Sequence, residues 1–182
     1  MQSTLSVPGG LDVATDHNVD TVYIGDLFNY SSVNGVSGEV QKIKRGLRDH
    51  FELAMTVTVQ NDKVVTSSWF ADAVEIFDRH TGDSLASYHN LNDPVDAILL
   101  DDGRVLVAEQ GTGNLVAIDT KNDNVREVLV SGISGMAALH PASKDEVYLS
   151  KIGTGQLLRI NLKSGKQSVV TDGLLQPEGF DV

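Results

Sequence analysis

The chain repeats one short sequence at a nearly constant spacing. Residues 105–118 read VLVAEQGTGNLVAI, and residues 147–160, 42 positions later, read VYLSKIGTGQLLRI, with six of the fourteen positions identical. Residues 64–77 carry the same alternation 41 positions before the first of these, and a fourth copy begins at Val22 and resumes at residues 38–43. A fixed period of this length, built from short β-type runs, is typical of β-propellers and other repeat arrays.

Each copy predicts four strands in the same order. An apolar strand follows a Pro or Gly, a polar turn leads to the second strand, and a turn rich in Gly, Asn and Asp separates the third strand from the fourth. The insertion in the first copy, residues 27–37, is rich in Ser, Asn and Gly, and we predict a loop there. Residues 40–44 (VQKIK) then become the third strand of that copy.

The predicted fold class is all-β: a β-propeller of four four-stranded blades plus the first strand of a fifth, within a single domain of residues 1–182. The motif Pro-x-Gly-apolar-Asp-Val occurs in residues 7–13 and again in residues 176–182. The second occurrence would open a further blade, so we expect an open or incomplete ring, either an excerpt of a longer propeller or a half that pairs with a copy of itself. The alternative is a compact four-bladed ring with a frayed C-terminal strand. The predicted blades are residues 8–54, 55–92, 93–133 and 134–173, followed by the start of a further blade at 174–182.

The composition limits what the chain can bind. Its 25 acidic and 14 basic residues give a net charge of −11, which argues against nucleic acid and anionic membrane surfaces, because both require a cationic face. The chain has no cysteine, so disulfides, thiolate metal sites and Cys nucleophiles are excluded. The N-terminal sequence MQSTLSVPGG lacks the pattern of a secretory leader. We therefore expect a cytoplasmic protein if the chain is complete, and a periplasmic or secreted one if a leader was removed.

The blade pattern resembles the six-bladed propellers of the SMP-30/gluconolactonase, NHL and strictosidine-synthase-like group, and the resemblance covers essentially the whole chain. Enzymes of the SMP-30 type hold one divalent cation with a Glu, an Asn from a Pro-Asn-Gly motif and an Asp from a Pro-Asp-Gly motif. The resemblance implies a site of this kind. Here Gly9 stands in place of the Asn and Val95 in place of the Asp, and only Glu178, in Pro177-Glu178-Gly179, keeps a carboxylate in such a position. The resemblance therefore names Glu178 as the one candidate metal ligand.

Polar residues end the second strand of every copy. They are Asp26, Ser68, Glu109 and Lys151, and their equivalent positions place them on one face of the repeat array. Asp26 and Glu109 are candidate ligand-binding residues of a rim on that face. The alternative is that these side chains cap the following turns, and Glu109 and Lys151 could also pair with each other.

Three further positions complete the candidate ligand site. His89 precedes a blade junction, and Asp93 and Asp96 follow closely enough to orient its imidazole. Trp69, the only tryptophan, begins the loop between a second and a third strand, where its ring would either stack on a ligand or pack between blades.

We interpret the chain as a ligand- or partner-binding propeller without evident catalytic machinery. The alternative is a metal-dependent, SMP-30-like hydrolase of a small lactone or ester, completed by residues outside this chain, and a lyase or cyclase using a lone carboxylate is a third hypothesis. No cofactor is evident, apart from one divalent cation, Ca²⁺ or Zn²⁺, in the hydrolase alternative. The expected partners are a small molecule or a protein, with self-association through open blade edges.

Overall fold

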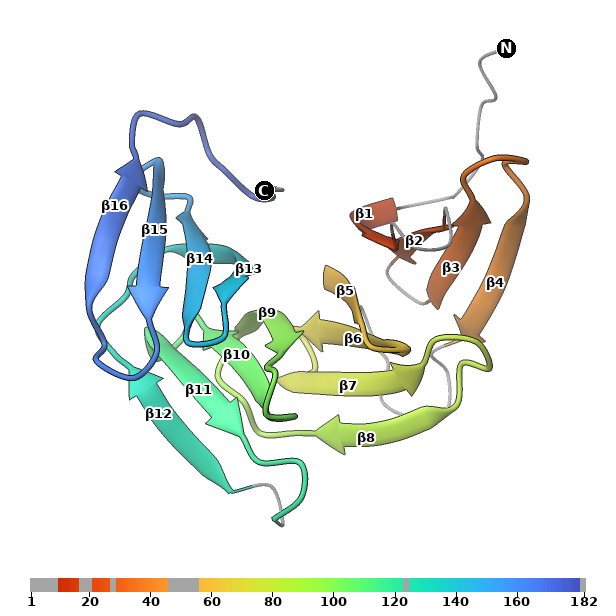
Figure 1. Cartoon of the computed structure of the whole chain (residues 1–182), viewed down its shortest axis with the longest axis horizontal. Coiled ribbons are helices and arrows are strands. Elements are labelled where there is room, and N and C mark those ends of the chain that lie inside the picture. Colours follow the sequence, from red (N-terminus) through yellow and green to blue (C-terminus); the bar gives the residue numbers. More distant parts are fainter. Residues whose placement is uncertain (1–9, 17–20, 27–28, 46–55, 123–124, 181–182) are drawn as a thin grey trace. The chain divides into compact units, whose positions relative to one another are not determined.

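The computed structural model of the chain describes residues 10–16, 21–26, 29–45, 56–122 and 125–180, and it describes only the backbone of residues 10–16, 25–26, 29–30 and 42–45. Within these ranges every regular element is a β-strand, and there are sixteen of them (Figure 1). None of the described residues forms a helix that could cross a membrane.

The strands form four antiparallel sheets, each made of four consecutive strands. The first sheet contains β1 (Gly10–Asp16), β2 (Thr21–Asp26), β3 (Asn29–Asn34) and β4 (Val40–Arg45). The second contains β5 (Thr56–Gln60), β6 (Lys63–Ser68), β7 (Ala73–Asp78) and β8 (Ser84–Tyr88). The third contains β9 (Pro94–Leu99), β10 (Val105–Glu109), β11 (Asn114–Ile118) and β12 (Arg126–Val130). The fourth contains β13 (Met136–Ser143), β14 (Glu146–Lys151), β15 (Gln156–Asn161) and β16 (Gln167–Thr171).

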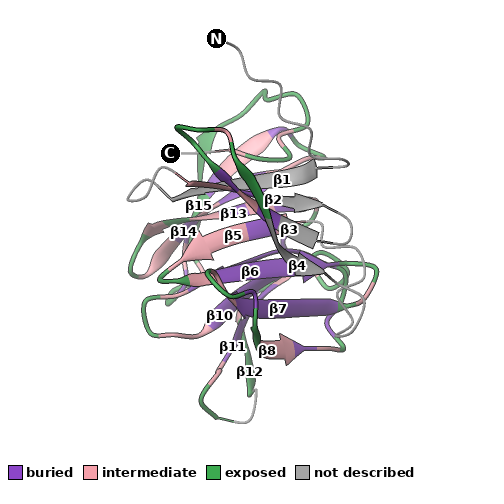
Figure 2. Cartoon of the chain, turned by 90° about the vertical axis from the view of Figure 1, so that its right-hand side faces the viewer, coloured by how far each residue is buried: buried purple, intermediate pink, exposed green. Residues whose placement is uncertain are grey.

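Burial falls from the inner strands of a sheet to its last strand. In the second sheet β6 and β7 are buried at nearly every position, whereas β8 is exposed at its start (Figure 2). In the third sheet β9 and β10 are buried throughout, and β12 is exposed over its first three residues. Continuous apolar runs such as VLVA in β10 suit strands that are covered on both faces.

The segment 27–37, predicted to be a loop, contains the strand β3. All six residues of β3 pair with β2, and residues 40–45 are therefore the fourth strand of the sheet, not the third. Ser31 and Val33 are buried and Ser32 between them is half-buried, which is the alternation of a strand. The prediction was wrong because the low strand propensity of Ser and Asn is overridden here by tertiary burial.

One turn recurs between the third and fourth strands of the sheets. Asp78 Oδ1 accepts hydrogen bonds of 2.9 Å from the backbone N–H groups two and three residues on, and Gly82 follows with a φ of 73°. Asn34, Asp119 and Asn161 occupy the same position in the other three sheets, and each accepts a backbone N–H at its side-chain oxygen. These Asx turns replace backbone hydrogen bonds that the strand ends lose.

The chain divides into two compact units, an N-terminal unit (Met1–Asn90) and a C-terminal unit (Leu91–Val182). In the N-terminal unit, Tyr23 of the first sheet packs with Val57, Val64 and Phe77 of the second. Burial, and to a smaller extent the charge of Asp62, raises the pKa of Tyr23 above 10.0. The expectation of a single domain stays a prediction.

The C-terminal unit has an apolar core between its two sheets. Leu106 and Leu115 of the third sheet lie in it with Leu149, Leu158 and other residues of the fourth, and several of these side chains are fully buried. Residues 172–180, which follow β16, form no strand, and residues 181–182 lie outside the described part. The opening strand of a further blade, expected over 174–182, stays a prediction.

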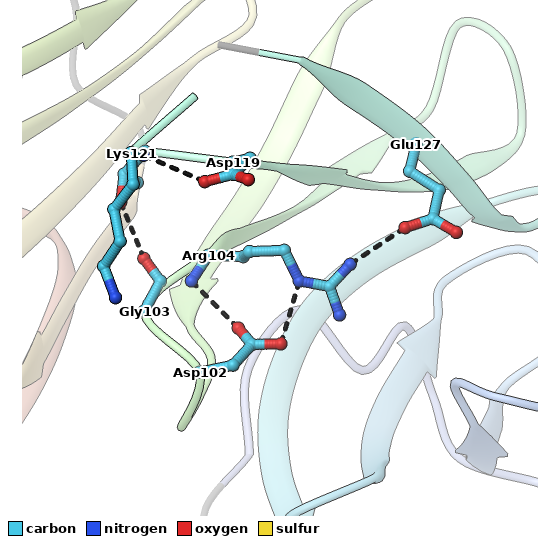
Figure 3. A network of polar contacts seen from close by, with 7 residues as sticks. Asp102, Gly103, Arg104, Asp119, Lys121 and Glu127 are labelled. Atoms are coloured by element: carbon cyan, nitrogen blue, oxygen red, sulfur yellow. Dashed lines mark hydrogen bonds and ion pairs between the residues drawn. The ribbon is translucent and has the colours of Figure 1, made fainter. Parts of the chain in front are cut away.

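A polar network holds the turn between β9 and β10 (Figure 3). Arg104 pairs with Asp102 at 2.9 Å and with Glu127 at 3.0 Å, and Thr120 Oγ1 donates to the carbonyl of Gly103. Burial by itself would raise the pKa of Asp102, but hydrogen bonds and charge from Arg104, with the charge of Lys121, hold that pKa below its ordinary value. Partly exposed ion pairs of this kind contribute little stability, so the network mainly fixes the turn.

Candidate functional site

The second strands end at the predicted polar positions. Ser68, Glu109 and Lys151 are the last residues of β6, β10 and β14, and each precedes a four-residue turn. Ser68 Oγ accepts a hydrogen bond from the backbone N–H of Ala71 at 3.2 Å, so it caps its turn. The equivalent residue Asp26 ends β2, and its side chain lies outside the described part of the structure.

Glu109 is a buried carboxylate that joins two loops. Its Oε2 accepts a hydrogen bond from Thr112 Oγ1 at 3.0 Å, and its Oε1 accepts one from the backbone N–H of Asn92 at 3.2 Å. The side chain is 4% exposed, and it forms no ion pair with Lys151, which is also described. The predicted binding residue therefore fixes the β10–β11 turn to the segment that precedes β9.

Asp93 lies beside the same turn. The backbone N–H of Gln110 donates to the Asp93 carbonyl at 3.0 Å, and that of Gly111 donates to Asn92 at 3.2 Å. A Cβ added to Gly111 would lie 2.7 Å from Asp93 Oδ2 and 3.2 Å from the carbonyl oxygen of Asn92, so a larger residue here would force the Asp93 side chain to shift. The structure thus brings two of the predicted site residues, Asp93 and Glu109, to one place.

Asp96 lies in buried β9, where it pairs with Ala108, the residue before Glu109. Its Oδ2 accepts a hydrogen bond of 2.7 Å from the backbone N–H of Leu139 on β13, and its Oδ1 accepts one of 2.8 Å from Ala97. The carboxylate is 4% exposed. A buried charge needs partners of this kind, and here they connect the innermost strands of two neighbouring sheets.

Trp69 and the adjacent Phe70 form an exposed aromatic pair. Their rings are 5.4 Å apart at an interplanar angle of 79°, and the two residues are 39% and 64% exposed. They begin the β6–β7 turn, where the equivalent turns of the C-terminal unit carry Gln110-Gly111 and Ile152-Gly153. At 39% exposure Trp69 is partly covered, so stacking on a ligand and packing between blades both stay predictions for this ring.

The remaining predicted residues have separate positions. His89 is half-buried directly after β8, and Glu178 is exposed in the segment after β16. In the described part of the chain, no three His, Asp or Glu side chains are grouped so that they could hold a metal ion. Glu178 is therefore not part of a metal-binding group within the described residues. Residues 1–9, which include Gly9 of the first Pro-x-Gly motif, lie outside the described part of the chain.

Sequence reasoning missed two residues of interest. Phe70 adds a second exposed ring beside Trp69, and its place next to Trp69 in the turn was a usable signal. Glu75 in β7 is 3% exposed, and its Oε1 accepts a hydrogen bond from Ser87 Oγ at 3.1 Å. A charged residue within the apolar run AVEIF could have marked a buried polar position.

Comparison with known proteins places the fold. Virginiamycin B lyase from Staphylococcus aureus matches 91% of this chain with a TM-score of 0.68 and 14% identity, and the Swd1 β-propeller domain from Myceliophteria thermophila matches 96% with a TM-score of 0.71 and 13% identity. PorZ from Porphyromonas gingivalis matches 92% with a TM-score of 0.68 and 11% identity. The fold is a β-propeller. No family model matches the chain, and neither does any curated protein sequence.

The predicted fold class, an all-β propeller with four four-stranded blades, is confirmed by the four sheets and by these neighbours. No sheet in the described residues combines strands from the two ends of the chain, which agrees with a partial propeller. The chain spans 56% of the lyase, 59% of the Swd1 domain and 23% of PorZ. At these identities the likeness concerns the propeller fold and not the SMP-30/gluconolactonase family.

Proposed function

We propose that the chain belongs to a binding propeller, and that Trp69 and Phe70 are contact residues for its ligand or protein partner. The observation that carries the proposal is the exposure of both rings on a tight turn between two buried strands. Aromatic side chains supply large contact areas at low entropic cost, and they are enriched among residues that dominate binding energy. A turn fixed by its flanking strands presents them in a preorganised state.

Two buried carboxylates, Asp96 and Glu109, favour binding over catalysis. Each oxygen of Asp96 and of Glu109 already accepts a hydrogen bond from the chain. A general base must reach a substrate proton, and a carboxylate held this way inside the protein is poorly placed for that role. Structural neighbours include both a lyase and the propeller domain of Swd1, so the fold by itself supports either class of function.

Two probes test the proposal. Peptides are selected from a phage-displayed random library on the immobilised protein, and quinupristin, which the lyase binds in one of its structures, serves as a small-molecule probe. Binding is followed by tryptophan fluorescence. The protein's tryptophan emission comes from Trp69 alone, because the chain has one tryptophan. We expect a bound probe to change this emission, and Phe70→Ala to weaken binding roughly tenfold or more, which corresponds to about 1.4 kcal/mol.

Leu85→Ala is the matched control, because Leu85 is 52% exposed on β8 of the same sheet. It should leave the affinity unchanged. Probes that bind without changing the Trp69 emission, and equally well to Phe70→Ala, would refute a role for the aromatic pair.

A metal-dependent, SMP-30-like hydrolase or a lyase is the second candidate. It is favoured by the exposed Glu178 in a Pro-x-Gly motif and by the lyase among the structural neighbours. Glu178 would be one ligand of a Ca²⁺ or Zn²⁺ ion, with the others supplied by residues outside this chain. Metal analysis after dialysis of a protein that contains those further residues tests it: stoichiometric Ca²⁺ or Zn²⁺ that is lost in Glu178→Ala would support this candidate, and equal metal content in both proteins would reject it.

A further inference from the structure

The β6–β7 turn, residues 69–72, matches two other turns of the repeat. Ser68 pairs with Ala73 at its base, and equivalent strand pairs close the turns 110–113 and 152–155. Those two turns read Gln-Gly-Thr-Gly and Ile-Gly-Thr-Gly, without an aromatic or an acidic residue. The repeat therefore forms this turn without the two rings and the carboxylate that the β6–β7 turn carries.

The last position of the turn departs from the repeat in its backbone as well. It is glycine in both equivalent turns, Gly113 and Gly155, with φ values of 71° and 62°. Here it is Asp72, which has a left-handed φ of 50°. A residue with a Cβ adopts this region at a cost that glycine avoids, although Asp tolerates it better than most. Backbone strain of this kind motivates a functional hypothesis for the side chain, and Asp72 is exposed.

The turn presents both rings and the carboxylate close together. Trp69 and Asp72 are neighbours across the turn, because Ser68 and Ala73, which flank them, are paired. The ring of Phe70 lies 5.4 Å from that of Trp69 at 79°, so one cation against a ring face can lie within about 6 Å of both centroids. Ser68 Oγ accepts a backbone N–H of the turn at 3.2 Å and so helps to fix it. Since aromatic faces are electronegative, rings and carboxylate attract the same kind of group.

The basic residues of the same sheet lie at its other end. Within residues 56–88 they are Lys63 and Arg79. Lys63 begins β6 and pairs with Asp78, whereas the β6–β7 turn follows the opposite end of that strand. Arg79 pairs with Asp62 at 2.6 Å. In this segment the exposed charge at the turn is thus acidic, and the net charge of −11 adds a longer-range attraction for a cationic partner.

We propose that this turn binds an arginine side chain of a protein partner, with the guanidinium against Trp69 and Phe70 and its N–H groups bonded to the Asp72 carboxylate. The inference rests on the proposed function, whose contact residues are the same two rings. Arginine fits better than lysine because its planar guanidinium stacks on an aromatic ring while its N–H groups bind a carboxylate. A protein fits better than a small molecule, because small molecules bury most of their surface in concave sites and these side chains are exposed on a turn.

Synthetic peptides test the proposal on the full chain. One peptide carries arginines separated by glycines, and in two counterparts every arginine is replaced by lysine or by citrulline, its neutral analogue. Binding is followed by the emission of Trp69, the single tryptophan. The arginine peptide should bind roughly tenfold more tightly than the citrulline peptide, because citrulline loses both the ring contact of a cation and the ion pair. The lysine peptide should bind with intermediate affinity, since its ammonium does not stack.

Asp72→Asn separates the local carboxylate from the net charge. Asparagine also tolerates a left-handed φ, so the variant should keep the turn. It should bind the arginine peptide about threefold more weakly, as expected for an exposed ion pair. Asp101→Asn removes the same charge at an exposed position between β9 and β10 and should leave the affinity unchanged. Phe70→Ala should also weaken binding, and circular dichroism verifies that the variants keep the β-spectrum.

The outcomes separate this inference from the proposed function. An arginine peptide that leaves the Trp69 emission unchanged, or binds no better than the citrulline peptide, overturns the inference. So does an Asp72→Asn variant that loses no more affinity than Asp101→Asn, because net charge alone would then explain the attraction. If the peptides selected from the library still require Phe70, the proposed function stands in either case. If they bind Phe70→Ala equally well, the proposed function fails and the inference fails with it.

Discussion

Asp96 and Glu109 are buried carboxylates that hold loops and strands together. Each carboxylate accepts two hydrogen bonds from the chain, and two of the four donors, the backbone N–H groups of Leu139 and Asn92, belong to segments distant in sequence. Polar groups buried in this way stabilise a structure chiefly because leaving their partners unsatisfied is costly. Their presence at the candidate site thus reflects the joining of neighbouring strands and turns.

Replacing Asp96 should therefore lower stability. In Asp96→Ala the buried N–H groups of Ala97 and Leu139 lose their acceptor, and the free energy of unfolding should fall by about 1–3 kcal/mol. Urea denaturation measures this value. The exposed Asp101→Ala is the control and should change it by less than about 0.5 kcal/mol; equal effects would show that the Leu139 contact contributes little.

Asp78 makes the stability depend on pH at the acid end. The backbone N–H groups of Thr81 and His80 hold the pKa of Asp78 below 3.8, against an opposing effect of desolvation. A carboxyl whose pKa is lower in the folded state stabilises the fold above its unfolded pKa, and this contribution disappears as the pH falls through the folded pKa. The stability of the chain should thus decline below about pH 4 in part because Asp78 takes up a proton.

Asp78→Asn tests this because Asn34 and Asn161 fill the same position in other turns. The variant keeps the turn but cannot titrate. Its melting temperature should fall less between about pH 5 and about pH 2 than that of the unchanged protein. Parallel pH profiles of the two proteins would contradict the assignment.

At the level of elements, glycines let the turns between second and third strands approach the segments that follow the fourth strands. A Cβ added to Gly155 would collide with the carbonyl oxygen of Leu174, and one added to Gly113 would lie 2.9 Å from that of Ile133. Both glycines also have positive φ, 62° and 71°. The close approach allows two backbone hydrogen bonds of 2.9 Å: the N–H of Leu174 donates to the carbonyl of Gly155, and the N–H of Ile133 donates to the carbonyl of Gly113.

Comparing two alanine variants separates these effects. Gly165 has a φ of 68° and open space where a Cβ would lie, so Gly165→Ala should lower the free energy of unfolding by about 1–2 kcal/mol through backbone strain alone. Gly155→Ala should lower the free energy of unfolding further, and it should speed hydrogen exchange at the amide of Leu174. Denaturation and exchange measurements check both expectations, and equal costs without faster exchange would remove the role of the close approach.

For the molecule as a whole, the net charge of −11 should oppose compaction. Salt screens this repulsion over about 10 Å at 0.1 M. The melting temperature should rise by a few degrees when NaCl increases from about 0.02 to about 0.2 M at neutral pH. Differential scanning fluorimetry measures it, and near the sequence pI of about 4.7 the same salt step should have little effect. A salt response as large at that pH would point to a cause other than net charge.

The turn pattern shows how far sequence reasoning reaches. Asn34 to Gly38 repeats the spacing of Asp78 to Gly82, which marks the end of a third strand, so β3 was predictable from its turn although its serines concealed it. The partners of Glu109 were not predictable, because the Asn92 N–H lies 17 positions away. Trp69 was selected from the sequence, but its exposure depends on what packs around its turn.

The sequence alone determined the four-strand repeat, the sheet boundaries near residues 55, 93 and 134, and the propeller class. Those features follow from alternation and turn chemistry, which act between residues close along the chain. Only the tertiary structure decided that Asp96 and Glu109 bind the chain's own backbone and that Trp69 and Phe70 are exposed on their turn. These depend on contacts between residues far apart in sequence, and no local pattern encodes them.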